Sequence, residues 1–364
     1  MAVLAPPPSP PVLVIPAPYE VSYGRIIGRV SGGTEMLILS IDGEVVARRD
    51  LGRKRFDISF QIPARDVRVT IRAVDRRGRG SSTTVAPVFG LPRAAEPRGP
   101  PRRNVEDARL GRTVRSFARS FPGTCGVFVQ DLRTGVGAAW NAGARFPAAS
   151  TVKVAIAIEV LRALGGKPRR GSRLDVLLRK VIIPSDDRAA NELLVWLGGS
   201  MSGGAAKVNA LFRALAMDDT DMYGGYIVEQ GRIPVRTTSQ PSFVGKRTTA
   251  RDLAILMRSL NLAAVGRGRL PRHAFRPSMA RFLLYLVAHS QVSRIDRFLP
   301  RGQTTVLQKA GWTRKVRHDA GLVLWSSGSF VAVVLTWNAR GVGDSSDVLA
   351  GRIGRAAYLR FRRA

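Results

Sequence analysis

The sequence predicts an α+β protein in two parts, a small all-β module followed by a larger domain in which an antiparallel sheet is flanked by helices. Before residue 90, short apolar runs alternate with period two between turn signals, which is typical of antiparallel strands. After residue 104 the predicted order is a helix, strands, several helices, more strands and a closing helix. That order suits one sheet built from both ends of the segment, with a helical lobe inserted. The 364 residues, 45% of them hydrophobic, suffice for more than one core.

The N-terminal part divides into three segments by composition. Residues 1–18 are rich in proline and predict a flexible leader. Residues 19–90 predict a small antiparallel β-sandwich of immunoglobulin-like type, a module that usually binds or spaces rather than catalyses. Residues 91–103 contain four prolines and four arginines and predict a basic linker. The clearest strands of the sandwich are expected at Met36–Ile41, Phe56–Ile62 and Val67–Val74.

The larger domain is expected over 104–364. Asn104 is predicted to cap a helix that carries Glu106 and Asp107 in its first turn. Strands are expected at 125–129, 305–308, 321–325 and 330–335, and the closing helix at 345–362.

The segment Phe146-Pro147-Ala148-Ala149-Ser150-Thr151-Val152-Lys153 runs directly into an apolar helical stretch. Ser150 and Lys153 are three residues apart, so both side chains project from one face of the first helical turn. A lysine can remove the proton of a serine hydroxyl only if burial or nearby positive charge lowers the lysine pKa. The free N–H groups of the helix start can then stabilise an oxyanion. Alone, this spacing is weak evidence, because a chain with 58 Lys+Arg contains it by chance.

Two further segments strengthen the catalytic interpretation. Ser185-Asp186-Asp187 and Lys309-Ala310-Gly311-Trp312 follow in that order. With the first segment they resemble, with departures, the Ser-x-x-Lys, Ser-Asp-Asn and Lys-Thr-Gly set of class A β-lactamases and penicillin-binding proteins. From about Asn104 to the C-terminus the chain resembles the serine β-lactamase and DD-peptidase superfamily, most closely its class A-like branch. The resemblance also covers the runs at 189–194, 247–253 and 318–321.

The resemblance implies a role for each matching residue. Ser150 would be the nucleophile that forms the acyl-enzyme, Lys153 its base, and Ser185 would pass the proton towards the leaving nitrogen. Lys309 would bind a substrate carboxylate and polarise Ser185. The oxyanion would lie between the backbone N–H groups of Ser150 and Trp312. Two plainer interpretations compete with these roles: Ser185 as a helix-capping or turn residue, and Lys309 as a solvated surface lysine.

The expected substrate-binding residues depart from the family pattern at two positions. Asp187 replaces an asparagine with an acceptor-only carboxylate, which puts recognition of a substrate amide in doubt. Ala310 replaces the threonine whose hydroxyl would help to hold a substrate carboxylate. Thr313 is close enough in sequence to substitute for it, and Gly311 and Trp312 complete the expected set.

No residue clearly supplies a deacylation step. The stretch 218–226 lacks the Glu-x-x-Leu-Asn element that positions the deacylating water in class A β-lactamases. Glu229 is a nearby carboxylate, but its spacing is poor. We therefore expect weak or no hydrolysis of β-lactams.

Other candidate chemistry is weaker. His318-Asp319 invites a Ser-His-Asp interpretation, but Lys153 already supplies a base, so these two residues are expected to tie adjacent strands together. Cys125, the single cysteine, excludes an intrachain disulfide and is expected to be a buried structural thiol. With one cysteine and three histidines, we expect no metal site and no cofactor.

The formal net charge of +32 is extreme. Such a surface attracts polyanions, and the affinity must fall as salt rises. Charge alone does not name the partner: an anionic cell-wall polymer and anionic membrane are candidates, and nucleic acid is less expected but stays open. The competing explanation is a coding bias that places arginine on solvated faces.

The sequence thus predicts a serine hydrolase that forms an acyl-enzyme at Ser150, on a peptidoglycan-like peptide, a β-lactam-like small molecule or a related amide or ester. The alternative is a catalytically silent fold that acts as a cationic cell-wall or polyanion-binding module. The resemblance implies an extracytoplasmic or secreted location. The proline-rich N-terminus shows no secretory signal, and no apolar run is long enough for a transmembrane segment.

Overall fold

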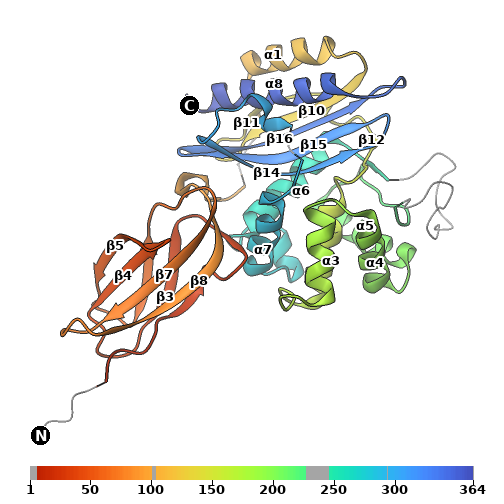
Figure 1. Ribbon diagram of the computed structural model, residues 1–364. Helices are drawn as coiled ribbons and strands as arrows, with labels where there is room; N and C mark the ends of the chain where they lie inside the picture. The colour runs from red at the N-terminus through yellow and green to blue at the C-terminus, as the bar shows by residue number, and fades with distance from the viewer. Residues whose placement is uncertain (1–5, 101–103, 227–245, 293, 364) are drawn as a thin grey trace, which may run out of the picture. The chain divides into compact units, whose positions relative to one another are not determined.

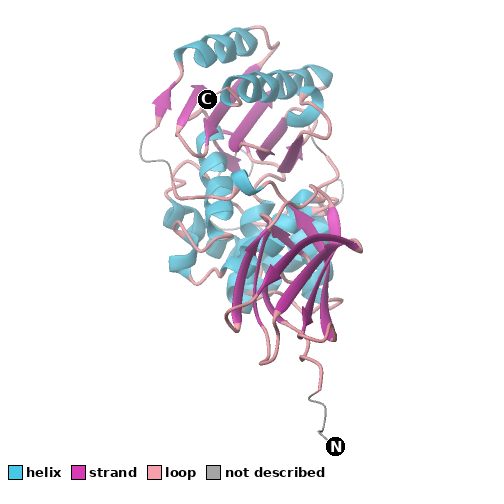
Figure 2. Ribbon diagram, turned by 90° about the vertical axis from the view of Figure 1, so that its left-hand side faces the viewer, coloured by secondary structure: helices cyan, strands magenta, loops and turns pink. Residues whose placement is uncertain are grey.

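The chain of the computed structural model divides into two compact units, Met1–Glu96 and Pro97–Ala364 (Figure 1). The first unit is built mainly of strands, and the second mixes strands with helices (Figure 2). The α+β class predicted for the larger domain is therefore confirmed. The structure describes residues 6–100, 104–226, 246–292 and 294–363.

The first unit is all-β and contains two sheets. Its strands are β1 (Val12–Ile15), β2 (Glu20–Ser22), β3 (Arg25–Arg29), β4 (Met36–Ile41), β5 (Glu44–Asp50), β6 (Arg55–Ser59), β7 (Asp66–Val74) and β8 (Gly80–Gly90). The strand orders are β1-β3-β6 and β2-β8-β7-β4-β5. Alternate residues of both sheets, including Ile26, Ile58, Leu39 and Ile71, share one core, as the period-two pattern predicts. The immunoglobulin-like type of this module stays a prediction.

The prediction of a flexible leader over 1–18 is wrong for residues 12–15. They form β1, which pairs antiparallel with β3. The four residues are apolar and mostly β-branched, and prolines flank them without interrupting them, so they can pair at the edge of a sheet. A second difference is β2, which pairs in parallel with β8 in an otherwise antiparallel unit.

A six-stranded sheet forms the centre of the second unit. Its strands are β9 (Val105–Glu106), β10 (Thr124–Asp131), β11 (Val136–Trp140), β14 (Thr304–Trp312), β15 (Arg317–Trp325) and β16 (Gly328–Trp337). The order is β14-β15-β16-β10-β11-β9, so the two ends of the segment meet where β16 pairs with β10. This confirms the prediction of a sheet built from both ends. Because β14 lies at the edge of the sheet, half of its backbone polar groups are left for other partners.

Helices cover both faces of this sheet (Figure 1). On one face, α1 (Ala108–Arg119) and α8 (Asp344–Phe361) pack side by side. On the other lie α2 (Lys153–Leu164), α3 (Arg173–Ile182), α4 (Asp187–Gly198), α5 (Met201–Leu215), α6 (Ala250–Ala263) and α7 (Pro277–Ala288). A short pair, β12 (Phe146–Pro147) and β13 (Arg247–Thr248), leads into α2 and α6. No helix among the described residues is long and apolar enough to cross a membrane.

The first helix begins later than predicted, and Asn104 does not cap it. The side-chain oxygen of Asn104 accepts a hydrogen bond from Gln130, and the next residues form β9 beside β11. The cap is Asp107, whose Oδ1 accepts from the Leu110 N–H at 2.8 Å. Its Oδ2 accepts from Nε of Arg360 on α8 at 2.6 Å. One carboxylate thus serves both the helix start and a salt bridge between the two outer helices.

Candidate active site

Ser150 lies in the turn that leads into α2. The Lys153 N–H donates to the Ser150 carbonyl oxygen at 3.2 Å, and the helix itself begins at Lys153, slightly later than predicted. The preceding residue, Ala149, has a φ of 47°, a left-handed conformation that is uncommon for a residue with a Cβ. Ser150 is half-buried, and its hydroxyl makes no hydrogen bond with any residue that the structure describes. That hydroxyl is therefore free to meet a substrate.

Lys153 begins α2, a helix whose first nine residues, 153–161, are all buried. Its own side chain is 0% exposed. Its Nζ donates to the carbonyl oxygen of Ser185, to Ser185 Oγ at 3.4 Å and to Asp187 Oδ1 at 2.6 Å. Burial lowers the pKa of Lys153, whereas the carboxylate of Asp187 acts to raise it. Burial thus shifts the pKa of Lys153 in the direction that a general base needs, and the carboxylate of Asp187 acts in the opposite direction.

Ser185 joins the two lysines of the site. Its Oγ accepts a hydrogen bond from Lys309 Nζ at 2.8 Å in addition to the one from Lys153. The cap of α4 is Asp186, whose Oδ1 accepts from the Ala189 N–H at 2.7 Å, so the capping interpretation of Ser185 is wrong. Because two amines donate to the Ser185 oxygen, its own O–H proton remains available for a third group.

Lys309 is buried, which contradicts the surface-lysine interpretation. The residue is 1% exposed, and its Nζ also donates to the Ala310 carbonyl oxygen at 2.9 Å. Burial, with the positive charge of Lys153 as the second cause, lowers the pKa of Lys309 to about 7. Near neutral pH the amine of Lys309 is therefore only partly protonated.

Gly311 brings β14 against the Ser150 turn. A Cβ atom at Gly311 would lie 2.8 Å from the Ser150 nitrogen and 3.0 Å from the Thr151 nitrogen. The Thr313 N–H donates to the Val316 carbonyl oxygen at 2.9 Å, which makes these two a hydrogen-bonded pair of the β14–β15 hairpin. By the alternation of an antiparallel ladder, the N–H of Trp312 then points away from β15, off the open edge of the sheet. The two N–H groups expected to form the oxyanion site, those of Ser150 and Trp312, thus belong to two segments that are in close contact.

The remaining expected substrate-binding residues are less engaged with this network. Ala310 is buried at 1% exposure and offers no hydroxyl. Thr313 lies in the hairpin turn, where its hydroxyl accepts from the Lys315 N–H at 3.3 Å. Trp312 is 45% exposed, and the guanidinium of Arg294 lies 5.5 Å from its ring centroid. The structure therefore brings Lys153, Ser185, Asp187 and Lys309 into one network. Among the described residues, the hydroxyls of Ser150 and Thr313 form no hydrogen bond with this network.

His318 and Asp319 do not form a catalytic pair. His318 Nε2 lies 2.7 Å from the Pro147 carbonyl oxygen, and the Thr336 N–H donates to its Nδ1. Burial lowers the pKa of His318 to about 4, so the ring is neutral with its proton on Nε2. The Asp319 carboxylate instead accepts from the N–H groups of Arg294 and Ile295. His318 thus ties β15 to its neighbour β16, as predicted, whereas Asp319 does not join adjacent strands but holds the segment at 294–295. His318 also contacts the segment before Ser150. Elsewhere, the predicted burial of the Cys125 thiol is also confirmed.

Tyr226 is a site residue that sequence reasoning missed. Its ring centroid lies 4.7 Å from Lys153 Nζ, and its backbone is held by Asn191, which both accepts from the Tyr226 N–H and donates to the Tyr226 carbonyl oxygen. Burial raises the pKa of Tyr226, so its phenol is neutral. Within 218–226, a phenol ring and not a carboxylate is therefore the group beside Lys153. Glu229 lies outside the described residues.

Lys246 is a second residue that was missed. Its Nζ lies 4.2 Å from the centroid of the Tyr226 ring, on which Lys153 also lies, and donates to the Gly225 carbonyl oxygen at 2.5 Å. Burial lowers the pKa of Lys246 to about 8. The Lys246 carbonyl oxygen accepts from the Ala148 N–H at 2.8 Å, which braces the chain just before Ser150. No sequence signal separates this lysine from the many other basic residues.

Comparisons with known proteins agree on one family. The model of the family described as "Beta-lactamase enzyme family" matches residues 109–169 and 166–361. The curated proteins contain no match to this chain.

Several solved structures share the fold of the second unit. PBP-A has a TM-score of 0.57 at 21% identity, covering 73% of this chain and 99% of that one. A mutant of PBP-A, solved as an acyl-enzyme complex with penicillin G, has a TM-score of 0.56 at 22% identity, covering 73% and 100% of the two chains. A β-lactamase from Sphaerobacter thermophilus has a TM-score of 0.55 at 23% identity, covering 70% and 97%. At such identities these structures establish the fold alone.

Proposed function

This chain belongs to the β-lactamase enzyme family, within the superfamily of serine β-lactamases and penicillin-binding proteins, and we propose that it forms an acyl-enzyme at Ser150. The observation that carries this proposal is the buried network in which the Ser185 hydroxyl accepts hydrogen bonds from both Lys153 and Lys309. Burying two lysines beside one hydroxyl costs folding free energy, and such clusters are typical of functional sites. Ser150, the candidate nucleophile, lies three residues before Lys153 in the chain.

The proposed reaction moves one proton along this network. The Ser150 oxygen attacks the carbonyl carbon of the substrate, and neutral Lys153 takes its proton. The carbonyl oxygen, now negative, is stabilised by the N–H groups of Ser150 and Trp312. When the tetrahedral intermediate collapses, Ser185 gives its proton to the leaving nitrogen or oxygen and regains one from Lys153. The products are an ester on Ser150 and the free amine or alcohol.

A substrate carboxylate would help to prepare the base. In the free protein, Asp187 favours a proton on Lys153, while Lys309 has a pKa of about 7. An anion bound beside Lys309 would stabilise the charged form of Lys309. A charged Lys309 would in turn favour the neutral form of Lys153, since both amines share the Ser185 oxygen. This coupling favours substrates that carry a carboxylate near the scissile amide or ester.

We infer that the substrate is a peptidoglycan-like peptide or a related amide or ester, and that β-lactams acylate the site without efficient hydrolysis. The Tyr226 ring beside Lys153 supports the second part, because a neutral phenol cannot act as the carboxylate base that directs a deacylating water. Proteins of this family typically act outside the cytoplasm, which agrees with such a substrate.

The proposal is tested by treating the folded protein with a penicillin and, separately, with a fluorophosphonate. We expect a covalent adduct that peptide mass spectrometry assigns to Ser150, and no adduct in a Ser150→Ala variant. Absence of any adduct, under conditions that label an active relative, would contradict the proposal. It would leave the alternative of a silent fold that binds polyanions.

Asp187→Asn is expected to speed acylation on the acidic side of the pH profile. The substitution removes the carboxylate that raises the pKa of Lys153, so the neutral base persists to lower pH. The gain should reach up to about fivefold, since Asp187 is partly exposed and an exposed ion pair is worth little. The measurement is the acylation rate with a fluorophosphonate, which has no amide to recognise, between pH 5 and pH 9.

Glu192→Gln is the matched control for this prediction. Glu192 also lies on α4 and pairs with an arginine, Arg173, at 3.0 Å, but it does not contact Lys153. Its pH profile should coincide with that of the unmodified protein. An unchanged acid limb in Asp187→Asn would show that Lys153 is not the group that titrates.

A further inference from the structure

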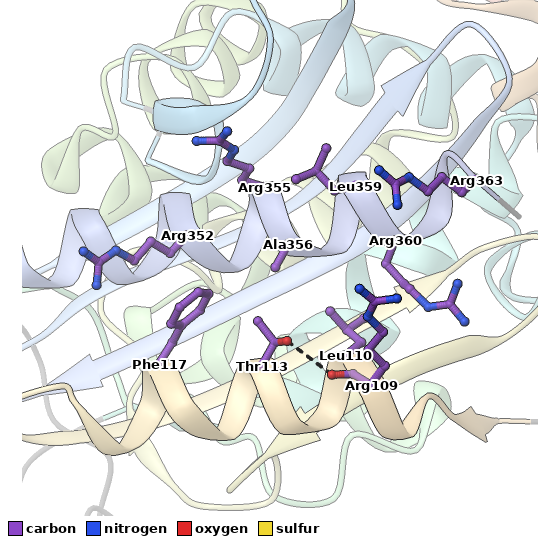
Figure 3. Close-up of a pocket in the computed structure, with 10 residues that line it drawn as sticks. All are labelled: Arg109, Leu110, Thr113, Phe117, Arg352, Arg355, Ala356, Leu359, Arg360 and Arg363. Carbon is purple, nitrogen blue, oxygen red and sulfur yellow. Dashed lines mark hydrogen bonds between the residues drawn. The ribbon is translucent and has the colours of Figure 1, made fainter.

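A groove lined by arginines runs between α1 and α8, on the face of the sheet opposite the helical lobe (Figure 3). Its volume is about 560 Å³. Five arginines line it, Arg109 from α1 and, from α8 and the residues after it, Arg352, Arg355, Arg360 and Arg363. No carboxylate is among the described residues that line it. The groove therefore concentrates positive charge that is not neutralised within it.

The five arginines are not equivalent. Arg360 is paired with Asp107, and the guanidinium of Arg352 lies 5.8 Å from the ring centroid of Phe117. The side chains of Arg109, Arg355 and Arg363 are exposed and form no ion pair or hydrogen bond with any described residue. Three guanidinium groups, one on α1, one on α8 and one just after α8, are thus left for a ligand, and each matches the geometry of a phosphate.

The shape of the groove selects a single extended chain. On α8 the lining residues run from Arg352 to Arg360, a length of roughly 12 Å at the rise of an α-helix, and Arg363 follows just after the helix ends. Packed helices lie only about 8–10 Å apart, so the hollow between them cannot admit a flat bilayer or a nucleic-acid duplex. Leu110, Ala356 and Leu359 give the groove apolar walls between the charges.

The lining also disfavours a nucleic-acid strand. Single strands are bound largely by stacking of their bases on aromatic side chains. The one aromatic side chain among the described lining residues is Phe117, and Arg352 covers it. A polymer with carbon segments between its phosphates, and without bases, suits both the apolar walls and the spaced guanidinium groups.

We propose that the α1–α8 groove binds one chain of a phosphodiester-linked polyol, such as poly(glycerol phosphate). The six-stranded sheet separates this groove from Ser150, so the polymer can be held while the candidate active site stays open. The groove would thus retain the hydrolase on an anionic polymer near its substrate. This proposal does not depend on acylation at Ser150.

The test measures binding of fluorescently labelled poly(glycerol phosphate) by anisotropy over a range of salt concentrations. The groove variant is Arg109→Gln/Arg355→Gln/Arg363→Gln. The control variant, Arg169→Gln/Arg213→Gln/Arg272→Gln, removes three exposed arginines from the lobe across the sheet. The groove variant should lose roughly tenfold or more in affinity, and the slope of log K against log salt should become less negative by about 2. The control variant should bind like the unmodified protein.

Three results would overturn the proposal. One is an equal loss in both variants, which would mean that binding is diffuse and follows net charge. The second is tighter binding of single-stranded DNA or of anionic lipid vesicles than of the polymer at equal charge and salt. The third is no binding of the polymer at about 50 mM salt.

Two further measurements guard against a folding artefact. Thermal unfolding and labelling of Ser150 should be the same in the groove variant as in the unmodified protein. If the groove variant unfolds, backbone amide hydrogen exchange of the unmodified protein, measured with and without the polymer, tests the binding site instead. The polymer should slow exchange in α1 and in the second half of α8. Slowed exchange elsewhere, with none in these helices, would contradict the proposal.

Discussion

Lys153→Met is expected to lower the rate of acylation at Ser150 by about a thousandfold, the usual effect of removing a general base. The amine of Lys153 is the one that touches both Ser185 and Asp187, and burial lowers its pKa. Methionine fills a similar volume without an amine, so the shape of the buried site is kept while the proton acceptor is lost. The measurement is the single-turnover rate of penicillin acylation followed by intact-protein mass spectrometry.

The fold should survive this change. Asp187 loses its partner, but its side chain is 42% exposed and can be hydrated. Lys207→Met is the matched control, because Lys207 donates only to the Leu197 carbonyl oxygen within the lobe, at 2.6 Å. Its acylation rate should be that of the unmodified protein. Should Lys153→Met acylate equally fast while remaining folded, the base must be another group, and Lys246 would be the next to test.

A second readout separates a base from a merely structural lysine. In Lys153→Arg the positive charge and much of the packing remain, but a guanidinium does not give up its proton in proteins. Rescue of acylation by arginine would therefore indicate a structural role. Continued loss would indicate that Lys153 must be deprotonated.

The sequence predicted the elements of the sheet well, for a physical reason. The strands β10, β15 and β16 are runs of buried apolar residues that no helix pattern fits, and turn residues bound them. The side chains of Lys153, Ser185 and Lys309, from three segments far apart in the chain, likewise share one hydrogen-bonded network, while the role of Ser150 stays a prediction. Local sequence pattern could not predict where α1 begins, because the residue that caps it also pairs with a residue far away in the chain. Asp107 caps α1 partly because Arg360, at the other end of the domain, holds its carboxylate.

The chemistry of the site was harder to predict than its position. In the sequence, Asp187 was noted only because it stands where the family pattern has an asparagine and so lacks an amide donor. In the structure, its carboxylate also forms an ion pair with Lys153, the candidate base. The Tyr226 ring contacts the amines of both Lys246 and Lys153, and Asn191 holds the backbone of Tyr226 by two hydrogen bonds. Such contacts depend on where loops run, and loop paths have no periodic signal.

Gly311→Ala is expected to reduce acylation by about a hundredfold, the cost of disturbing one donor of an oxyanion site. The added Cβ would lie 2.8 Å from the Ser150 nitrogen and 3.0 Å from the Thr151 nitrogen, both backbone atoms that cannot rotate away. Either β14 or the Ser150 turn must move, and the space between the N–H groups of Ser150 and Trp312 changes with it. Lys153 and Ser185 keep their side chains, so the proton path is left in place.

The matched control for this prediction is Gly166→Ala. Gly166 lies just after the far end of α2, where an added Cβ meets nothing within 4 Å. Both variants should be assayed for penicillin acylation across pH. Gly311→Ala should lower the whole profile without moving its acid limb, because the pKa of Lys153 is set by burial and by Asp187. If the acid limb of the pH profile moves instead, the substitution has changed the pKa of a lysine and not only the oxyanion site. If the acylation rate is undiminished, the oxyanion does not lie beside Gly311.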